Sequence, residues 1–179
     1  MSMKTIAQKK PSQITIDDGF VKKILRPYRE DTSYLKKAVF EYDKDSNEYP
    51  IVKGDFEIKE SCYIDDTGHF NAVEFNICFN QIGYTYLGYS IKEGLIPELE
   101  GFSKNNGNEF FEKQLSHFLI VNIQSSYKRP INSDQFYGEV GIKTITKKAS
   151  CTFIIMSCKY YDDDGGRSFG EITLAILNP

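Results

Sequence analysis

The alternation of apolar and polar residues changes its period near Leu119. From there to the C-terminus, apolar residues recur at every second position, which is typical of strands with one buried face. The pattern predicts four successive antiparallel strands, within residues 118–129, 135–150, 151–163 and 168–177. Before the last strand, the stretch DDDGGRS favours a hairpin turn, because Gly165 and Gly166 can adopt positive φ angles without a steric cost.

Upstream of these strands, a helical pattern covers roughly residues 70–91 and is apolar on nearly every side. Six polar residues interrupt it, namely Asn71, Glu74, Asn76, Asn80, Gln81 and Thr85. On an α-helix, Glu74, Gln81 and Thr85 share one narrow stripe, and Asn76 and Asn80 share a second, roughly opposite stripe. An unpaired buried amide costs about 1–3 kcal/mol, so each of these groups should meet a partner or a ligand. The two stripes predict different surroundings, such as the protein's own sheet on one side and a partner subunit on the other.

The N-terminal part of the chain predicts three further elements. They are a helix within residues 14–28 and strands at 34–43 and 49–64, with a turn at 43–50 between the strands. Asp17 or Asp18 can cap the helix, and Pro27 ends it.

The remaining segments complete one domain. A Gly-, Asn- and Pro-rich loop at 92–109 and a short helix at 110–118 connect the long helix to the later strands. Residues 1–13 are predicted to form a flexible arm, and residues 14–179 a single domain. A sheet that curls around one apolar helix buries both surfaces at once, so the pattern predicts an α+β fold of this kind.

Composition narrows the function classes. Hydrophobic residues make up 40% of the 179 residues, and the formal net charge is −3 without a Lys/Arg run, so nucleic acid is not an expected partner. No segment is long and apolar enough for a membrane span, and the N-terminus lacks the apolar core of a secretory signal.

The four cysteines, Cys62, Cys78, Cys151 and Cys158, form no C-x-x-C pair and have no metal-like spacing with the two histidines. We therefore expect reduced thiols in a cytoplasmic protein and no metal site. A nucleophilic Cys62 assisted by His69 is the alternative.

The start of the long helix has the strongest chemical signature. Asn71 followed three residues later by Glu74 fits a capping box, and Gly68 allows a sharp turn before it. A helix N-terminus presents free N–H groups and a partial positive charge, which suit a carboxylate, a phosphate or a developing oxyanion. The alternative is that Asn71 is only a cap and His69 only a loop side chain.

The stretch ESCYIDDTGHFNAVEFNICFNQIGY, residues 60–84, closely resembles the FcoT family of hot-dog-fold enzymes. The resemblance extends from Leu25 onward through RPY, KGDFEI, KRPIN and the C-terminal DDDGGRSFGEITLAILNP. That family was first described as long-chain acyl-CoA thioesterases, and relatives add glycine to a (2E)-enoyl-acyl-carrier protein in isonitrile lipopeptide biosynthesis. The resemblance implies a hot-dog fold, an antiparallel sheet wrapped around one long central helix. It also implies dimers joined edge to edge, with the active site at the dimer interface beside the helix N-terminus.

The resemblance also implies site residues. Tyr28, Tyr63, Asn71 and Asn80 match the tyrosines and asparagines proposed for the family, and His69 and Glu74 match within the same block. The family lacks the carboxylate base of many other hot-dog thioesterases. Glu74 is the nearest carboxylate here, and its capping role competes with a catalytic one.

Two reactions on a thioester fit these residues, hydrolysis and conjugate addition of glycine, because both place negative charge on the same carbonyl oxygen. Glycine addition also needs a base, for which His69 is the candidate, since histidine titrates near neutral pH. Lys128 and Arg129 are candidate cations for the glycine carboxylate or for the phosphate of a phosphopantetheine arm. The alternative is that they form a solvated strand end before Pro130.

We therefore predict catalytic roles for Tyr63, His69, Asn71 and Glu74, and substrate binding by Tyr28, Asn80, Lys128 and Arg129. The predicted reaction is addition of glycine to a (2E)-enoyl-acyl-carrier protein. A long-chain acyl-CoA thioesterase and a non-catalytic acyl-binding protein are the alternatives. The expected partners are an acyl carrier protein or acyl-CoA, glycine, and a second copy of the chain, with no tightly bound cofactor beyond the coenzyme A or phosphopantetheine of the substrate.

Overall fold

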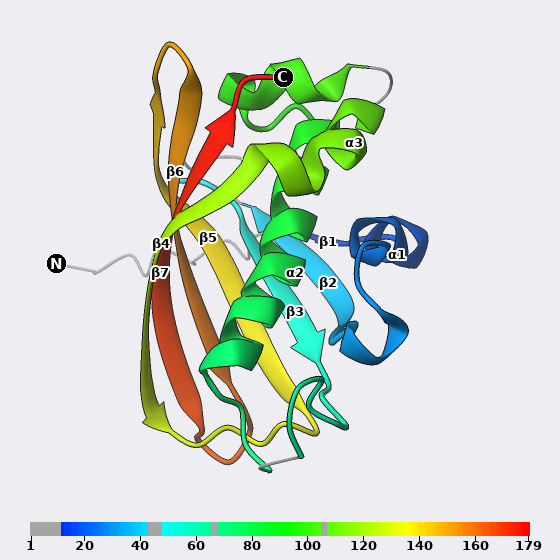
Figure 1. Ribbon diagram of the computed structural model, residues 1–179, viewed down its shortest axis with the longest axis vertical. Helices are drawn as coiled ribbons and strands as arrows, with labels where there is room; N and C mark the ends of the chain where they lie inside the picture. The colour runs from blue at the N-terminus through cyan, green and yellow to red at the C-terminus, as the bar shows by residue number, and fades with distance from the viewer. Residues whose placement is uncertain (1–11, 43–47, 66–67, 105–106) are drawn as a thin grey trace, which may run out of the picture.

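The computed structural model describes residues 12–42, 48–65, 68–104 and 107–179. In this part of the chain, an antiparallel sheet wraps around one long helix, α2, and two smaller helices, α1 and α3, pack against the C-terminal half of α2 (Figure 1). The elements in chain order are β1 (Ser12–Thr15), α1 (Asp18–Leu25), η1 (Glu30–Thr32), β2 (Leu35–Tyr42), β3 (Ile51–Phe56), α2 (Ala72–Lys92), η2 (Pro97–Ser103), α3 (Asn108–His117), β4 (Phe118–Arg129), β5 (Phe136–Lys147), β6 (Cys151–Tyr161) and β7 (Arg167–Leu177). The predicted hot-dog arrangement is confirmed.

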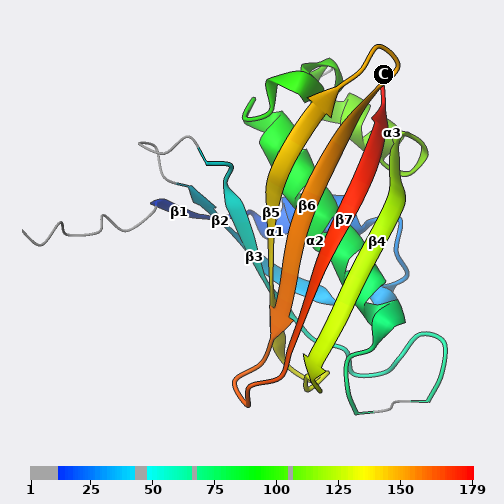
Figure 2. The same cartoon turned by 90° about the vertical axis from the view of Figure 1, so that its left-hand side faces the viewer.

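The strand order in the sheet is β1-β2-β3-β5-β6-β7-β4, and every neighbouring pair is antiparallel. Figure 2 shows β5, β6, β7 and β4 side by side, with α2 passing behind them. The four predicted C-terminal strands are confirmed with close to their predicted bounds. Their spatial order differs from the chain order, because β4 pairs with β7 and becomes the edge of the sheet.

The N-terminal elements depart from prediction in their bounds. Helix α1 begins at Asp18, and Asp17 Oδ1 accepts a hydrogen bond from Phe20 N at 3.1 Å, so the predicted cap is confirmed. The residues before Asp17 are extended and pair with β2, so the helix is shorter than 14–28. The arm predicted for residues 1–13 lies outside the described residues except for its last two, which belong to β1.

Two other predicted segments differ as well. The turn at 43–50 lies mostly outside the described residues. The strand predicted over 49–64 ends at Phe56, and the chain then forms a long loop that leads to α2. Within the predicted loop at 92–109, residues 97–103 form the 3-10 helix η2.

The core under the first turns of α2 is aromatic. Rings from β3, β5, β6, α2 and the loop before α2 pack edge to face, tilted or stacked, with centroids 4.9–6.1 Å apart. The members are Phe56, Phe70, Phe75, Phe136 and Tyr160, all nearly inaccessible to solvent. Aromatic pairs of this geometry contribute beyond the area that they bury. The cluster therefore fixes where α2 begins.

Both polar stripes of α2 are confirmed, and they have different surroundings. Gln81 is fully buried; its Oε1 accepts from Tyr34 N at 3.0 Å and Leu35 N at 2.9 Å, and its Nε2 donates to Thr32 O at 2.6 Å. This stripe thus joins α2 to the start of β2. On the other stripe, Asn76 is exposed and Asn80 is half-buried, and Asn80 Nδ2 donates to Asn76 O at 2.8 Å. No helix in the described part of the chain is long and apolar enough to cross a membrane.

Candidate active site

The loop before α2 is attached to the segment that follows β4. Phe70 N donates to Ile131 O at 3.0 Å, and Ile58 N donates to Ser133 O at 2.9 Å. These two backbone bonds bring residues from three distant parts of the sequence to one end of the sheet. They set the position of the first residue of the helix cap, Asn71, relative to the end of β4.

The predicted capping box is present. Asn71 Oδ1 accepts from Val73 N at 2.9 Å and from Glu74 N at 3.4 Å, and Asn71 N donates to Glu74 Oε2 at 3.0 Å. Among the amides of this first turn, Ala72 N makes no hydrogen bond to any described residue. The positive end of the helix dipole is therefore presented to solvent through one free amide.

A pocket of about 350 Å³ lies at this amide, between residues 69–72 and residues 127–131. It brings together four of the eight predicted site residues, His69, Asn71, Lys128 and Arg129. Lys128 and Arg129 are exposed and form no ion pair with a carboxylate in the described part of the chain. The pocket therefore combines a helix N-terminus, an imidazole and two unneutralised cations.

Tyr127 also lines the pocket, and the sequence did not single it out. Its ring packs edge-on against Phe75 at 5.9 Å, and its hydroxyl donates to Ser125 Oγ at 3.1 Å. Burial raises the pKa of the Tyr127 phenol, so the hydroxyl keeps its proton. The sequence signal that could have identified Tyr127 is its position directly before the KRPIN motif, in a strand whose apolar residues alternate with polar ones.

Glu74 lies beneath the pocket. Its side chain is 2% exposed, is absent from the pocket lining, and is engaged in the capping box. Burial first, and the Glu74 carboxylate second, raise the pKa of the Cys78 thiol well above its usual value. Cys78 is accordingly a neutral core residue, and Cys62 is exposed in the loop outside the pocket lining.

The other three predicted residues are not brought to this pocket within one chain. Tyr63 is 46% exposed in the loop before α2. Tyr28 is half-buried against the core, and burial, followed by Tyr84 and Cys78, raises the pKa of its phenol. Asn80 lies nine residues beyond Asn71, about 13 Å farther along α2, next to Phe118 at the start of β4.

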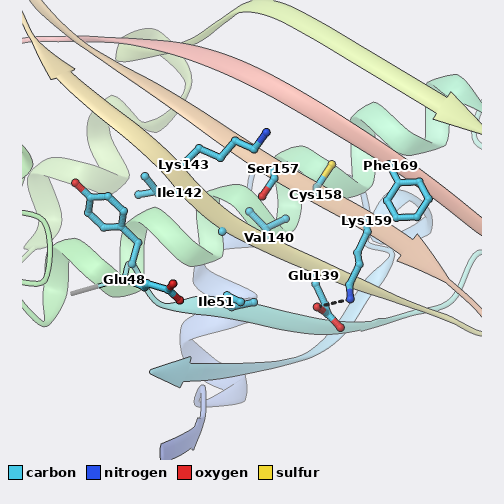
Figure 3. A pocket seen from close by; sticks show the side chains of 12 residues that line it. Glu48, Ile51, Glu139, Val140, Ile142, Lys143, Ser157, Cys158, Lys159 and Phe169 are labelled. Carbon is cyan, nitrogen blue, oxygen red and sulfur yellow. Dashed lines mark ion pairs between the residues drawn. The ribbon is translucent and has the colours of Figure 1, made fainter. Parts of the chain in front are cut away.

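A larger hollow of about 600 Å³ lies on the face of the sheet that points away from α2 (Figure 3). Three of its charged side chains form ion pairs, since Lys159 Nζ lies 2.8 Å from Glu139 Oε2 and Lys143 Nζ 2.6 Å from Glu171 Oε2. No histidine and no helix N-terminus reach it. The pocket at the start of α2 is therefore the better candidate site. In the described residues, no group of three or more His, Cys, Asp or Glu side chains could hold a metal ion.

Comparison with known proteins agrees with this assignment of fold. The sequence profile of the FcoT-like thioesterase domain matches residues 23–176. A (2E)-enoyl-ACP glycyltransferase from Streptomyces coeruleorubidus is 37% identical over 90% of this chain and 98% of its own length. The protein of the same name from Mycobacterium marinum is 34% identical over 91% of this chain and 88% of its own. The solved structure of Cj0977, a sigma28-regulated virulence protein from Campylobacter jejuni, shares the fold, with a TM-score of 0.51 over 89% of this chain and 97% of that chain at 10% identity.

Proposed function

The chain belongs to the family of FcoT-like thioesterase domains, and from this membership we infer that it is an enzyme that acts on acyl thioesters. Its reaction is the addition of glycine to a (2E)-enoyl group on an acyl carrier protein, the activity named for the relatives that match about nine-tenths of the chain. The observation that carries the proposal is the pocket at the start of α2. The pocket is lined by His69, by Ala72, whose amide has no partner among the described residues, and by Lys128 and Arg129, which form no ion pair with a described carboxylate.

In the first step the glycine amine attacks the β-carbon of the enoyl thioester. A C–N bond forms, the carbon–carbon π pair moves toward the α-carbon, and negative charge develops on the thioester oxygen. The Ala72 amide and the positive end of α2 are suited to stabilise that oxygen. Removing one preorganised donor from such a site typically costs about 3–4 kcal/mol of barrier.

Proton transfer is assigned to His69. Glycine enters as an ammonium ion, and the imidazole takes one proton so that the nitrogen lone pair can attack. After addition the imidazolium gives that same proton to the α-carbon, so His69 ends neutral, and the new amine nitrogen keeps its remaining protons as a secondary ammonium. No leaving group departs, and the product remains a thioester with a new secondary amine.

Lys128 and Arg129 are assigned to the anionic parts of the substrates. A glycine carboxylate in the pocket would meet both cations, and so would the phosphate of a phosphopantetheine arm. Asn71 is assigned to orienting the thioester, Tyr28 and Asn80 to the acyl group farther along α2, and Glu74 to holding the cap. Tyr63 lies outside the pocket of its own chain, so its assignment to the thioester requires the second copy proposed below.

Hydrolysis of the thioester is the second candidate, because the family is named for it. It needs a water activated by a base. None of the described residues that line the pocket is a carboxylate, and Glu74 Oε2 accepts from Asn71 N. Glycine addition is therefore favoured, since an amine is the stronger nucleophile once it is neutral.

A second copy of the chain is the proposed partner along β4. This edge strand exposes Leu119, Val121, Ile123 and Tyr127 to 39–55%, and Val73 on α2 is 46% exposed. A twelve-residue edge with unpaired backbone groups and apolar side chains is a template for pairing. Because Tyr127, Lys128 and Arg129 end the same strand, a copy paired along β4 would close one side of the pocket.

A cytoplasmic location belongs to the same proposal, because the four cysteines are free and spaced for neither disulfides nor metal. The isonitrile lipopeptide pathway remains a prediction from the resemblance.

The absorbance of the conjugated enoyl thioester tests the reaction. Both reactions destroy the conjugated thioester, but glycine addition consumes glycine and releases no thiol, whereas hydrolysis releases the thiol and keeps the double bond. We expect the enoyl absorbance to fall only when enzyme and glycine are both present. A glycine-independent release of thiol without loss of the double bond would replace the proposal with hydrolysis.

A further inference from the structure

One carboxylate joins the turn between β6 and β7 to the segment that follows β4. Asp162 Oδ2 accepts from Asn132 N at 2.7 Å, while its Oδ1 accepts from Gly166 N at 2.7 Å and Asp164 N at 3.0 Å. Hydrogen bonds to an ionised acceptor are roughly twice as strong as neutral ones. Both oxygens are therefore used, one toward each segment.

The same turn is packed directly against the pocket wall. A Cβ placed on Gly166 would come within 2.8 Å of Ile131 Cα and would overlap the carbonyl oxygen of Pro130. Gly165 has a φ of 87°, and the Arg129 guanidinium lies beside it. The motifs KRPIN and DDDGGR, far apart in the sequence, thus form one contact.

This contact continues to the start of α2. Asn132 N is held by Asp162, and the carbonyl of the preceding residue, Ile131, accepts from Phe70 N at 3.0 Å. Phe70 directly precedes the cap residue Asn71. One chain of hydrogen bonds therefore runs from the β6–β7 turn, through one wall of the pocket, to the other wall.

We propose that Asp162 is a positioning residue, which holds residues 130–132 so that Lys128 and Arg129 face His69 and the free Ala72 amide. The expected effect of Asp162 on turnover rests on the proposed function, whereas its expected effect on the two pocket walls does not. The neighbouring carboxylates do not share this role: Asp163 accepts only from Tyr137 OH at 3.3 Å, and Asp164 is exposed and accepts no hydrogen bond in the described part of the chain.

The test uses Asp162→Asn in the full chain. An amide has one acceptor oxygen, so its NH₂ must face either Asn132 N or the two turn amides, and one side loses its acceptor. Gly166→Ala disturbs the same contact by volume instead of charge. Asp164→Asn is the matched control in the same turn, and Gln114→Ala removes a buried hydrogen bond to Ile24 O at the far end of α2 as a control for general destabilisation.

The first readout is amide hydrogen exchange without substrate, followed residue by residue by NMR. We expect Asp162→Asn and Gly166→Ala to speed exchange of the Phe70, Val73 and Asn132 amides about tenfold or more, while the β5–β6 ladder stays protected. Asp164→Asn should match the wild type. Unchanged protection at Phe70, or an equal rise across the whole sheet as in Gln114→Ala, would overturn the proposal.

The second readout is glycine-dependent turnover of the enoyl thioester. Asp162→Asn and Gly166→Ala should lower it about tenfold or more, since small displacements of positioned groups are costly. The control variants Asp164→Asn and Gln114→Ala should retain wild-type turnover under conditions in which they remain folded. Full turnover in Asp162→Asn would contradict the positioning role. A wild-type protein without any turnover would reject the proposed function instead, and the exchange result would still decide the role of Asp162.

Discussion

At the scale of single residues, the cap of α2 determines which group can face a substrate. Asn71 Oδ1 and Glu74 Oε2 engage the amides of residues 71, 73 and 74, and Ala72 N has no hydrogen-bond partner among the described residues. The spacing of Asn71 and Glu74 was enough to predict this box. The free amide could not be read from side chains, because it belongs to the backbone. Likewise, Gln81 was expected to have a partner, but its partners Tyr34 N and Leu35 N lie 47 and 46 residues away and depend on the fold.

His69 gives the first prediction at this scale. His69→Gln keeps a polar side chain of similar length but cannot carry a proton between nitrogen and carbon. We expect glycine addition to fall by about 10²–10⁴-fold, the usual contribution of a general base, with little loss of acyl-thioester binding. Fixed-time assays of enoyl thioester consumption at saturating glycine measure this loss of activity.

His117→Gln is the matched control, because His117 lies at the end of α3 beside Ser116 and Phe102, away from the pocket. It should retain wild-type turnover. Equal turnover in the two variants would remove His69 from the mechanism.

At the scale of elements, the edge strand β4 has the largest effect on the candidate site, because its last residues line the pocket. The period-two pattern predicted its bounds, and α2 was predicted within two residues. The pattern could not predict that β4 pairs with β7, because the neighbours of a strand depend on how α2, η2 and α3 return the chain across the sheet. For the same reason the sequence did not foresee that Tyr127 ends an exposed edge at the pocket.

The edge strand leads to a prediction for assembly. Val121→Lys with Ile123→Lys places two charges in an apolar edge, and burying an unpaired charge is strongly unfavourable. We expect the double variant to be a folded monomer in analytical ultracentrifugation at micromolar concentration, where the wild type is a dimer or larger. Loss of assembly should also lower turnover, because the pocket would lose one side.

Ile14→Lys provides the control for that experiment. Ile14 is 38% exposed on β1 at the opposite edge of the sheet, close to the 41% of Ile123. This variant should assemble as the wild type does. A double variant on β4 that still assembles would contradict an interface along that strand.

At the scale of the whole molecule, protonated tyrosines and cysteines make up part of the core around α2. Burial raises the pKa of Tyr160 and Cys78 well above their usual values and that of Cys158 to about 12. The hydroxyl of Tyr160 is buried without a hydrogen-bond partner in the described part of the chain. Such groups stabilise the fold only while they remain neutral.

This core predicts a loss of stability at alkaline pH. The unfolded chain releases these protons near the ordinary values of about 8.5 for Cys and 10 for Tyr, whereas the folded chain keeps them. The contribution is therefore fully present below those values and is lost as pH rises, at up to about 1.4 kcal/mol per pH unit for each group. Urea unfolding at pH 7 and at about pH 10.5 measures it, with the loss expected only at the higher pH.

Tyr160→Phe separates this effect from other alkaline damage. It removes an unpaired hydroxyl and keeps the ring, so stability at pH 7 should be unchanged or higher, and the alkaline loss smaller. An alkaline loss as steep as that of the wild type would contradict the assignment to buried tyrosine.

The central claim is that the pocket at the start of α2 joins glycine to an enoyl thioester. Intact-mass spectrometry of an enoyl-loaded acyl carrier protein, incubated with the enzyme with and without glycine, tests it most directly. We predict that the carrier gains the mass of one glycine only when glycine is present, and that His69→Gln suppresses the gain. Loss of the acyl group regardless of glycine, or a carrier whose mass never changes, would contradict the account.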